Sequence, residues 1–437
     1  MSATQQYQDR LRTPEQIAAD FESGWVITSD AALAAPKAIY TALGARATEG
    51  TITDVTMNSF IDFFPMPCYN QALADKVKGF TWFSGPFARM AVNSGFADLM
   101  LGNYRDGPGV VREYMEFDAF CITVSPMDKH GYFSTGCSAS LAEAFISKSK
   151  RIYLEVNPKM PRALSGPIIH ISQVTALCEV DAPLFFIPMM MQADETSTTI
   201  GNLIAEQVPN GATLQLGIGA IPNEVAKALE QKRDLGIHTE MLTDGMIGLL
   251  ECGAVNNSKK PIHTGRTVAT FALGAQRIYD YIDDNPSVLM LPVDYVNDPA
   301  VIAMHPNFIS VNAAIEVDFF GQVSAETIGT RHHSGTGGQH DFVRGAWQSK
   351  GGQSFIAIPS TSTGKDGVVR SKINSTLTPG AVVSTPKNDV DMVVTEFGIA
   401  KLRGRSLGQR TKALIEIAHP DFRDQLTFEA KKRNIML

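Results

Sequence analysis

The sequence predicts an α/β protein made of two similar open α/β domains, and three observations support this prediction. Short apolar runs typical of strands alternate with helical segments, for example in residues 51–125. The chain has 437 residues, more than one ordinary hydrophobic core accommodates, so two domains are expected. Two stretches also share one order of features: a helix, a glycine, a short apolar strand, a turn of small residues, a proline and a second helix.

The shared order of features begins at Gly24 and again at Gly211. Gly24 lies twelve residues before Pro36, and Gly211 lies eleven residues before Pro222. Because strand–turn–helix units recur in any α/β protein, internal duplication and simple recurrence both stay open. The polar segment 192–197 separates the two stretches. We therefore predict an N-terminal domain over residues 1–193 and a C-terminal domain over residues 194–437.

Local signals predict several elements of the first half. Thr13 and Pro14 suit the cap and the first turn of an amphipathic helix over 13–23. The apolar run 118–125 predicts a buried strand, and the turn after it carries His130. That histidine could act as an acid or base, or it could simply hydrogen-bond within its loop. Further expected elements are a strand over 25–28, a helix after Pro36, a helix over 141–148 and a strand over 151–156.

In the second half, the run 213–216 predicts a strand that enters a glycine turn. Pro222 and Asn223 are expected to open the helix that follows, and Asp244 and Gly245 predict a turn. The remaining predicted elements are helices over 200–207, 275–282 and 413–417 and strands over 235–238, 266–271, 287–291, 308–312, 355–359 and 391–395.

Composition limits the classes of function. The net charge of −7 argues against a nucleic-acid surface. The five cysteines form no CxxC pair, so a zinc ribbon or a disulfide framework is not expected. The N-terminus lacks the apolar core of a signal peptide, and the longest apolar run, 184–191, is too short to span a bilayer. We therefore expect a cytoplasmic protein that contacts neither membrane nor nucleic acid.

Glu240 is the candidate nucleophile. It lies after a strand-like run and one helix beyond the Gly-x-Gly turn, and reacting groups of open α/β sheets gather at the carboxyl ends of strands. Bare N–H groups at a helix start suit a developing oxyanion, so Gly219 and Ala220 are expected to face the acyl group. A carboxylate nucleophile forms a mixed anhydride and needs a good leaving group such as a thiolate, which favours thioester substrates. Glu326, which also follows a strand-like run, is the alternative carboxylate.

Other known motifs are absent or incomplete. The sequence contains no GxSxG, P-loop or HExxH pattern. The turn Gly217–Pro222 is G-x-G-x-x-P, and Glu240 lies near the position of a ribose-binding acid, so a nucleotide-binding domain stays open. His332, His333 and His340 have no acidic partner at a clear metal-site spacing, and no metal is expected.

Seven segments together resemble the acetyl-CoA hydrolase/transferase family, and within it the 4-hydroxybutyrate and butyryl-CoA:acetate CoA-transferases. The segments are LGIGAIPNEV, LGIHTEMLTDG, EVDFFGQV, SGTGGQHDFVRGA, VSPMDKHGYFSTG, EVNPKMPR and ALIEIAHPDFRD. The resemblance covers nearly the whole chain and is most specific in residues 205–425. It implies two similar open α/β domains of the CoA-transferase type, with the active site at the domain interface and the catalytic glutamate carried by the C-terminal domain.

The resemblance also implies a reaction and a site. Glu240 corresponds to the glutamate that forms an acyl-glutamyl anhydride and then a glutamyl-CoA thioester. CoA would be a substrate thioester rather than a tightly bound cofactor, with a short-chain carboxylate as co-substrate and a homodimer or larger homo-oligomer as the assembly. The Lys365 ammonium could meet a phosphate or could be a solvated loop lysine. The residues implied to contact CoA are Gly217, Ile218, Gly219, Ala220, Ile221, Ile315, Gly338 and Lys365.

Three classes of function remain open from the sequence. The first is a CoA-transferase that moves CoA between 4-hydroxybutyryl-CoA or butyryl-CoA and acetate. The second is an acyl-CoA hydrolase, which shares the fold and admits water to the anhydride. The third is a non-catalytic protein that binds CoA or a nucleotide through its glycine turns.

Overall fold

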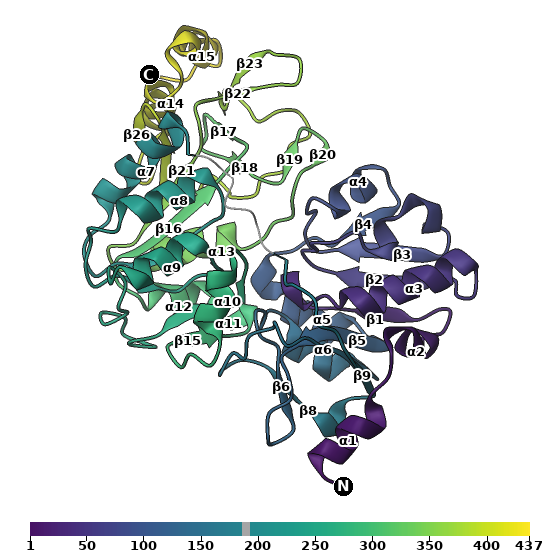
Figure 1. Cartoon of the computed structure of the whole chain (residues 1–437). Coiled ribbons are helices and arrows are strands. Elements are labelled where there is room, and N and C mark those ends of the chain that lie inside the picture. The colour runs from purple at the N-terminus through teal and green to yellow at the C-terminus, as the bar shows by residue number, and fades with distance from the viewer. Residues whose placement is uncertain (186–192) are drawn as a thin grey trace. The chain divides into compact units, whose positions relative to one another are not determined.

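The computed structural model describes residues 1–185 and 193–437 (Figure 1). Its contacts divide the chain into two compact units, each described here by itself. Unit 1 comprises Met1–Ile187, Glu240–Leu242 and Val268–Val296. Unit 2 comprises Pro188–Thr239, Thr243–Thr267 and Asn297–Leu437. The predicted division at residue 193 stays a prediction. The two units are not continuous in sequence, since the short segments near residues 240 and 268–296 group with unit 1.

Unit 1 is built on a seven-stranded sheet in which every pair of neighbours is parallel. All six residues of its strand β5 are buried, as expected of a parallel strand covered on both faces, and this confirms the strand predicted there. In sheet order, the strands are β4 (Ala97–Leu99), β3 (Val77–Thr81), β2 (Val55–Ser59), β1 (Val26–Thr28), β5 (Ala119–Val124), β7 (Ile152–Val156) and β9 (Ala176–Glu179).

Most helices of unit 1 bury apolar residues, whereas the first, Ala3–Arg10, has none buried. Helix α2 begins at Pro14, and the Thr13 side chain caps it by accepting a hydrogen bond from the Gln16 amide, which confirms the predicted helix start. The helix ends at Ala19, four residues earlier than predicted. The helices are α1 (Ala3–Arg10), α2 (Pro14–Ala19), α3 (Lys37–Glu49), α4 (Ala88–Asn93), α5 (Gly107–Tyr114) and α6 (Ala142–Lys148).

Later segments of the chain complete unit 1. Strand β12 (Met241–Leu242) pairs in parallel with β14 (Phe271–Ala272), and β6 (Tyr132–Ser134) pairs with β8 (Ile168–His170). Two helices, α10 (Gln276–Ile282) and α11 (Val293–Val296), and the strand β15 (Val288–Met290) follow. The strand predicted over 266–271 is observed as two short strands, β13 (Thr267–Ala269) and β14.

Unit 2 contains a six-stranded sheet that is parallel except at β26. The strand predicted over 213–216 is confirmed with the same bounds. In sheet order, the strands are β11 (Gly236–Ile237), β10 (Thr213–Leu216), β16 (Phe308–Ala313), β21 (Gln353–Ala357), β25 (Met392–Thr395) and β26 (Gly398–Lys401).

Several predicted helix boundaries of unit 2 were wrong. The helices predicted from residues 200 and 413 begin at Glu195 and Leu407. Helix α8 begins at Ala220, before Pro222. The residue that precedes it, Gly219, is its N-cap and has non-helical backbone angles. Asp244 opens helix α9 rather than a turn, since the Thr243 carbonyl accepts hydrogen bonds from the Met246 and Ile247 amides. The helices of unit 2 are α7 (Glu195–Gln207), α8 (Ala220–Ala228), α9 (Asp244–Glu251), α12 (Pro299–Ala303), α13 (Gln339–Gln348), α14 (Leu407–Glu416) and α15 (Pro420–Lys432).

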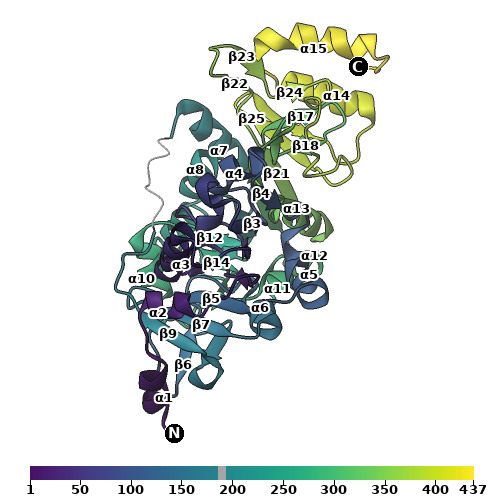
Figure 2. The ribbon, with the colours of Figure 1, turned by 90° about the vertical axis from the view of Figure 1, so that its right-hand side faces the viewer.

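Small sheets and a hairpin extend unit 2. In Figure 2, helix α15 lies beside the hairpin of β22 (Thr361–Thr363) and β23 (Val369–Ser371), and residues of both line one cavity. The remaining strands are β17 (Glu316–Asp318), β18 (Val323–Ser324), β19 (Thr327–Ile328), β20 (Arg331–His332) and β24 (Ile373–Asn374). Each unit is thus an α/β structure on a mainly parallel sheet, which confirms the predicted fold class.

Candidate functional site

The glycine turn of unit 2 connects strand β10 to helix α8. The Gly217 amide donates to the Val311 carbonyl of β16 at 3.0 Å, so the start of the turn is fixed to the neighbouring strand. Gly219 has φ +128° and ψ 179°, a backbone conformation that residues with a Cβ rarely adopt. It precedes the helix without providing a side-chain cap. The helix therefore begins with backbone N–H groups that a ligand can use.

Two other predicted residues, Ile315 and Gly338, lie at the same edge of this sheet. Ile315 follows β16, which is the parallel neighbour of β10, and its amide donates to the Ser324 carbonyl at 2.8 Å. Gly338 precedes helix α13, whose Gln339 side chain donates to the Ala313 carbonyl at 2.7 Å. The structure thus brings the glycine turn, Ile315 and Gly338 to neighbouring strand and helix ends. This edge is where open α/β sheets bind ligands.

Lys365 lies at the tip of the β22–β23 hairpin, where its side chain is exposed. Below the hairpin is a cavity of about 490 Å³ that Ile315 and Ser362 both line. Lys372 faces the same cavity. Burial lowers the pKa of Lys372, while the Glu396 carboxylate acts in the opposite direction. The cavity therefore combines apolar side chains such as Ile315 with charged ones, among them the half-buried Lys372 and the carboxylate of Glu316.

Glu240 belongs to unit 1 and immediately precedes strand β12. Its carbonyl accepts hydrogen bonds from the Thr270 amide at 2.9 Å and the Phe271 amide at 3.1 Å. Two donors therefore fix the backbone of Glu240, while its side chain is only half-buried. The predicted nucleophile thus sits on a rigid backbone and keeps access to a reactant.

Tyr104 is a titratable residue whose pKa depends in part on the Glu240 carboxylate. It lies in the 3₁₀ turn Tyr104–Asp106, and its side chain is buried. Burial raises the pKa of Tyr104 well above its ordinary value, and the Asp30 and Glu240 carboxylates raise it further. The phenol is therefore neutral at physiological pH and lies within electrostatic reach of Glu240.

Asp30 lies just after strand β1 and is completely buried. The Ser138 hydroxyl and the Leu141 amide each donate to its carboxylate at 3.0 Å. Burial raises the pKa of Asp30 to about 6, while these hydrogen bonds and one from Ser140 limit the rise. The sequence analysis missed Asp30 and Tyr104. The sequence contained one signal for Asp30. It lies in the turn of the first strand–turn–helix stretch, and the second stretch has its glycine turn at the corresponding position.

The other candidate residues occupy different surroundings. His130 is exposed in the turn between β5 and β6, and its backbone amide donates to the Asp128 carboxylate at 2.8 Å. Glu326 is buried in unit 2 and accepts a hydrogen bond from the Thr336 hydroxyl at 3.2 Å. His340 pairs with Asp389 at 2.9 Å. Glu326 and His340 thus have structural partners.

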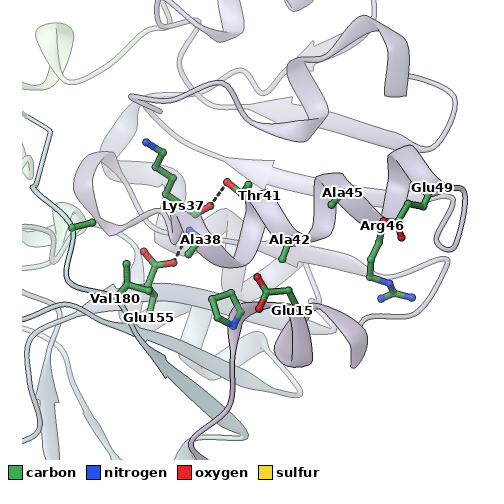
Figure 3. Close-up of a pocket in the computed structure, with 12 residues that line it drawn as sticks. Glu15, Lys37, Ala38, Thr41, Ala42, Ala45, Arg46, Glu49, Glu155 and Val180 are labelled. Atoms are coloured by element: carbon green, nitrogen blue, oxygen red, sulfur yellow. Dashed lines mark hydrogen bonds between the residues drawn. The ribbon is translucent and has the colours of Figure 1, made fainter.

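A second cavity, of about 540 Å³, lies in unit 1 along helix α3 (Figure 3). Its most buried polar group is Glu155 of β7, whose carboxylate accepts hydrogen bonds from the Ala38 amide at 2.8 Å and the Ile39 amide at 3.3 Å. Burial raises the pKa of Glu155 to about 7, and these amides oppose the rise. Glu155 therefore caps α3, which its own N-cap residue, Pro36, cannot do.

Within 1–185 and 193–437, no group of three or more His, Cys, Asp or Glu side chains is arranged to hold a metal ion. Over the same residues, no helix combines the length and apolar character needed to cross a bilayer.

Comparison with known proteins identifies the class that this fold and site define. The N-terminal domain of the acetyl-CoA hydrolase/transferase family matches residues 1–188, and its C-terminal domain matches residues 274–430. The chain is 44% identical to succinyl-CoA:cyclohexane-1-carboxylate CoA transferase of Geobacter metallireducens, over 99% of this chain and 98% of that protein. It is 37% identical to butyryl-CoA:acetate CoA-transferase of Anaerostipes caccae, over 100% and 99% of the two chains.

The fold agrees with these sequence matches. The crystal structure of 4-hydroxybutyrate CoA-transferase (abfT-2) from Porphyromonas gingivalis superposes with a TM-score of 0.82 at 33% identity, covering 98% of this chain and 99% of that one. The protein is therefore an enzyme of the CoA-transferase class. It belongs to the acetyl-CoA hydrolase/transferase family, as the resemblance in the sequence predicted.

Proposed function

We propose that this enzyme transfers CoA from a short-chain acyl-CoA, butyryl-CoA or 4-hydroxybutyryl-CoA, to acetate, with Glu240 as the covalent carrier. The observation that carries the proposal is the way in which the backbone and the surroundings of Glu240 are held. Two backbone amides hold its carbonyl, and its carboxylate lies in the field of a buried neutral phenol. This is the arrangement expected of a nucleophile that must stay oriented while it changes covalent partner.

The reaction proceeds by two exchanges at the Glu240 carboxylate. The carboxylate attacks the thioester carbonyl, the C–S bond breaks, and an acyl-glutamyl anhydride and CoA thiolate result. The thiolate then attacks the glutamyl carbonyl, forming glutamyl-CoA and releasing the original acid as its carboxylate. The acceptor carboxylate reverses both steps and leaves as the new acyl-CoA. Bonds of similar energy are exchanged throughout, so no external oxidant, metal or nucleotide is needed to balance the reaction.

The residues of unit 2 support a role in holding CoA. The N–H groups at the start of α8 suit the oxyanion that forms when the thioester carbonyl is attacked. Ile315 and Gly338 lie at the ends of neighbouring elements, and the cavity that Ile315 lines also contains the Lys372 ammonium. An apolar wall with a cationic group suits a molecule that carries both a pantetheine arm and phosphates. We propose that Gly217–Ile221, Ile315, Gly338 and Lys365 contact CoA, which acts as a substrate and not as a resident cofactor.

Intact-mass spectrometry after incubation with butyryl-CoA alone tests the proposal. The expected product is the protein carrying one CoA less one water. Borohydride should reduce this thioester and leave a stable alcohol at residue 240. Glu240→Gln should form no adduct, while Glu326→Gln, a buried carboxyl in unit 2, should form it normally. Release of free CoA without an adduct would replace the proposal with a hydrolase. Neither adduct nor release would leave a binding protein.

The acceptor is tested with a panel of carboxylates. The relatives' names include acetate, butyrate, 4-hydroxybutyrate and cyclohexane-1-carboxylate, so these acids and succinate form the panel. The expected result is the highest kcat/KM with acetate as acceptor and butyryl-CoA or 4-hydroxybutyryl-CoA as donor. A tenfold preference for succinyl-CoA with cyclohexane-1-carboxylate would overturn the proposed substrates but leave the proposed chemistry in place.

A further inference from the structure

The backbone of Glu240 is linked to the Tyr104 ring through Phe271. The Phe271 amide donates to the Glu240 carbonyl, and the Phe271 ring meets the edge of Tyr104 with centroids 6.4 Å apart. On its other side, Tyr104 stacks on Phe60 at 4.3 Å. All three aromatic side chains are buried. The orientation of the phenol is therefore fixed on two sides by residues of unit 1, one of which also holds Glu240.

The Tyr104 hydroxyl is fixed by a third set of contacts. It forms a hydrogen bond with the Ser140 hydroxyl, and a hydrogen bond from Ser140 also lowers the pKa of Asp30. Asp30 also accepts from Ser138 and from the Leu141 amide. These polar side chains are each at most 2% exposed. Buried polar groups thus run from Asp30, at the end of strand β1, to the Tyr104 phenol.

Burying a carboxyl group is costly, and a well-packed apolar residue at the same place is often equally stabilising. A fully satisfied buried network is instead suited to holding one side chain in one orientation. This set of polar groups ends at the Tyr104 phenol, whose pKa is raised by burial and further by the Asp30 and Glu240 carboxylates. Such a network suits the fixing of one dipole better than it suits a gain in stability.

We propose that Tyr104 is a positioning residue for Glu240, held in place by the hydrogen-bond chain through Ser140 to Asp30. The phenol dipole keeps the carboxylate in the orientation from which it attacks the thioester. This inference rests on the proposed function, in which Glu240 is the nucleophile. It adds three residues to the machinery of acyl transfer that act through Glu240 and need not touch the substrate.

Unit 1 contains a matched pair for comparison. Tyr69 is also buried, and its hydroxyl donates to the buried Asp62 carboxylate at 2.5 Å and contacts Ser59 at 2.6 Å. Burial raises the pKa of Tyr69, and Asp62 and Cys68 raise it further. Tyr69→Phe therefore also removes a phenol hydroxyl from a buried hydrogen-bond network, at a tyrosine whose pKa is raised by burial, Asp62 and Cys68. Any loss caused by disrupting a buried network in general will appear in both variants.

The test compares Tyr104→Phe with Tyr69→Phe in the full-length enzyme. Rapid-quench mass spectrometry gives the rate of CoA-adduct formation, steady-state kinetics give KM for acyl-CoA, and thermal unfolding reports stability. Tyr104→Phe should slow adduct formation about 10- to 100-fold with KM changed less than about twofold, because misplacing a reacting group costs rate. Tyr69→Phe should stay within about twofold of the wild-type rate. Asp30→Asn combined with Tyr104→Phe should be no slower than the slower single variant.

Two outcomes overturn the inference. If the wild-type enzyme forms the adduct and Tyr104→Phe forms it as fast as Tyr69→Phe does, Tyr104 does not position Glu240, although the proposed function stands. If the wild-type enzyme forms no adduct, the proposed function and the inference fail together. Should Tyr104→Phe fail to fold, Ser140→Ala, which leaves the Tyr104 ring in place, carries the same expectation and the same refuting result.

Discussion

Substitution of Gly219 by alanine separates backbone conformation from steric exclusion at the glycine turn. A Cβ built on Gly219 would meet only Pro222 Cδ, at 3.9 Å, so space is not the constraint. The constraint is the backbone, because φ +128° with ψ 179° is a conformation that alanine strongly disfavours. Holding a residue with a Cβ in such a conformation costs about 1–3 kcal/mol.

Gly217→Ala is the matched control. Gly217 is two residues away in the same turn and does not have a positive φ. Its added Cβ would lie 3.5 Å from the Val311 carbonyl oxygen, an ordinary contact. Alanine should therefore change stability by less than about 0.5 kcal/mol, as expected where no special feature is lost.

The strain at Gly219→Ala must appear either in stability or in ligand affinity. If the turn keeps its shape, urea unfolding should show a loss of about 1–3 kcal/mol. If the turn relaxes, the N–H groups at the start of α8 move, and the same free energy corresponds to about 5- to 150-fold weaker binding. Isothermal titration calorimetry with an unreactive thioether analogue of butyryl-CoA measures the affinity. Wild-type values in both measurements would refute the argument, as would equal damage from Gly217→Ala.

Three further predictions concern buried titratable groups and are checked by urea unfolding at two pH values. Burial and the nearby Lys260 and His263 lower the pKa of His305 to about 3. The folded protein therefore loses stability as pH falls below 6.5, where the unfolded chain takes up a proton and the folded one does not. Between pH 7 and pH 5, His305→Phe should lose about 2 kcal/mol less stability than the wild type. Burial lowers the pKa of Lys260 to about 7, so wild-type stability should fall between pH 9 and pH 7, and Lys260→Met should abolish that slope. Burial raises the pKa of Asp62 to about 6, so stability should fall by about 2 kcal/mol as pH rises from 4 to 7, and Asp62→Asn should remove this loss. An unchanged pH slope in any variant would contradict the corresponding prediction.

Sequence reasoning succeeded where the signal was local. The strand over 213–216 was predicted with its observed bounds because an apolar run ends there at a glycine. The helix after it began two residues earlier than predicted. Pro222 is the third residue of α8, where its missing N–H costs no intrahelical hydrogen bond, so a proline in the first turn does not mark the first residue. Asp244 was misassigned because an Asp-Gly pair suits both a turn and the first turn of a helix.

The surroundings of Glu240 could not be predicted in the same way. The carboxylate itself follows from strand order and the glycine turn, and its role as nucleophile remains a prediction. Its neighbours come from distant parts of the chain: Tyr104 meets Ser140 across 36 positions, and Asp30 meets the Leu141 amide across 111. Neither contact produces a periodicity or a short motif. Only the folded sheet, which places the loop after β1 beside the segment before α6, brings these groups together.

The assignment of Glu240–Leu242 and Val268–Val296 to unit 1 has a practical consequence for anyone wishing to express the halves separately. A gene cut at residue 193 would encode an N-terminal fragment without Phe271, so the Tyr104 ring would lose one of its two aromatic neighbours. The Ala139 amide would also lose its acceptor, the Thr270 carbonyl. A fragment of this kind should be recovered as an aggregation-prone species. Adding a synthetic peptide that spans residues 268–296 should improve its solubility by supplying the missing strands β14 and β15 and helices α10 and α11.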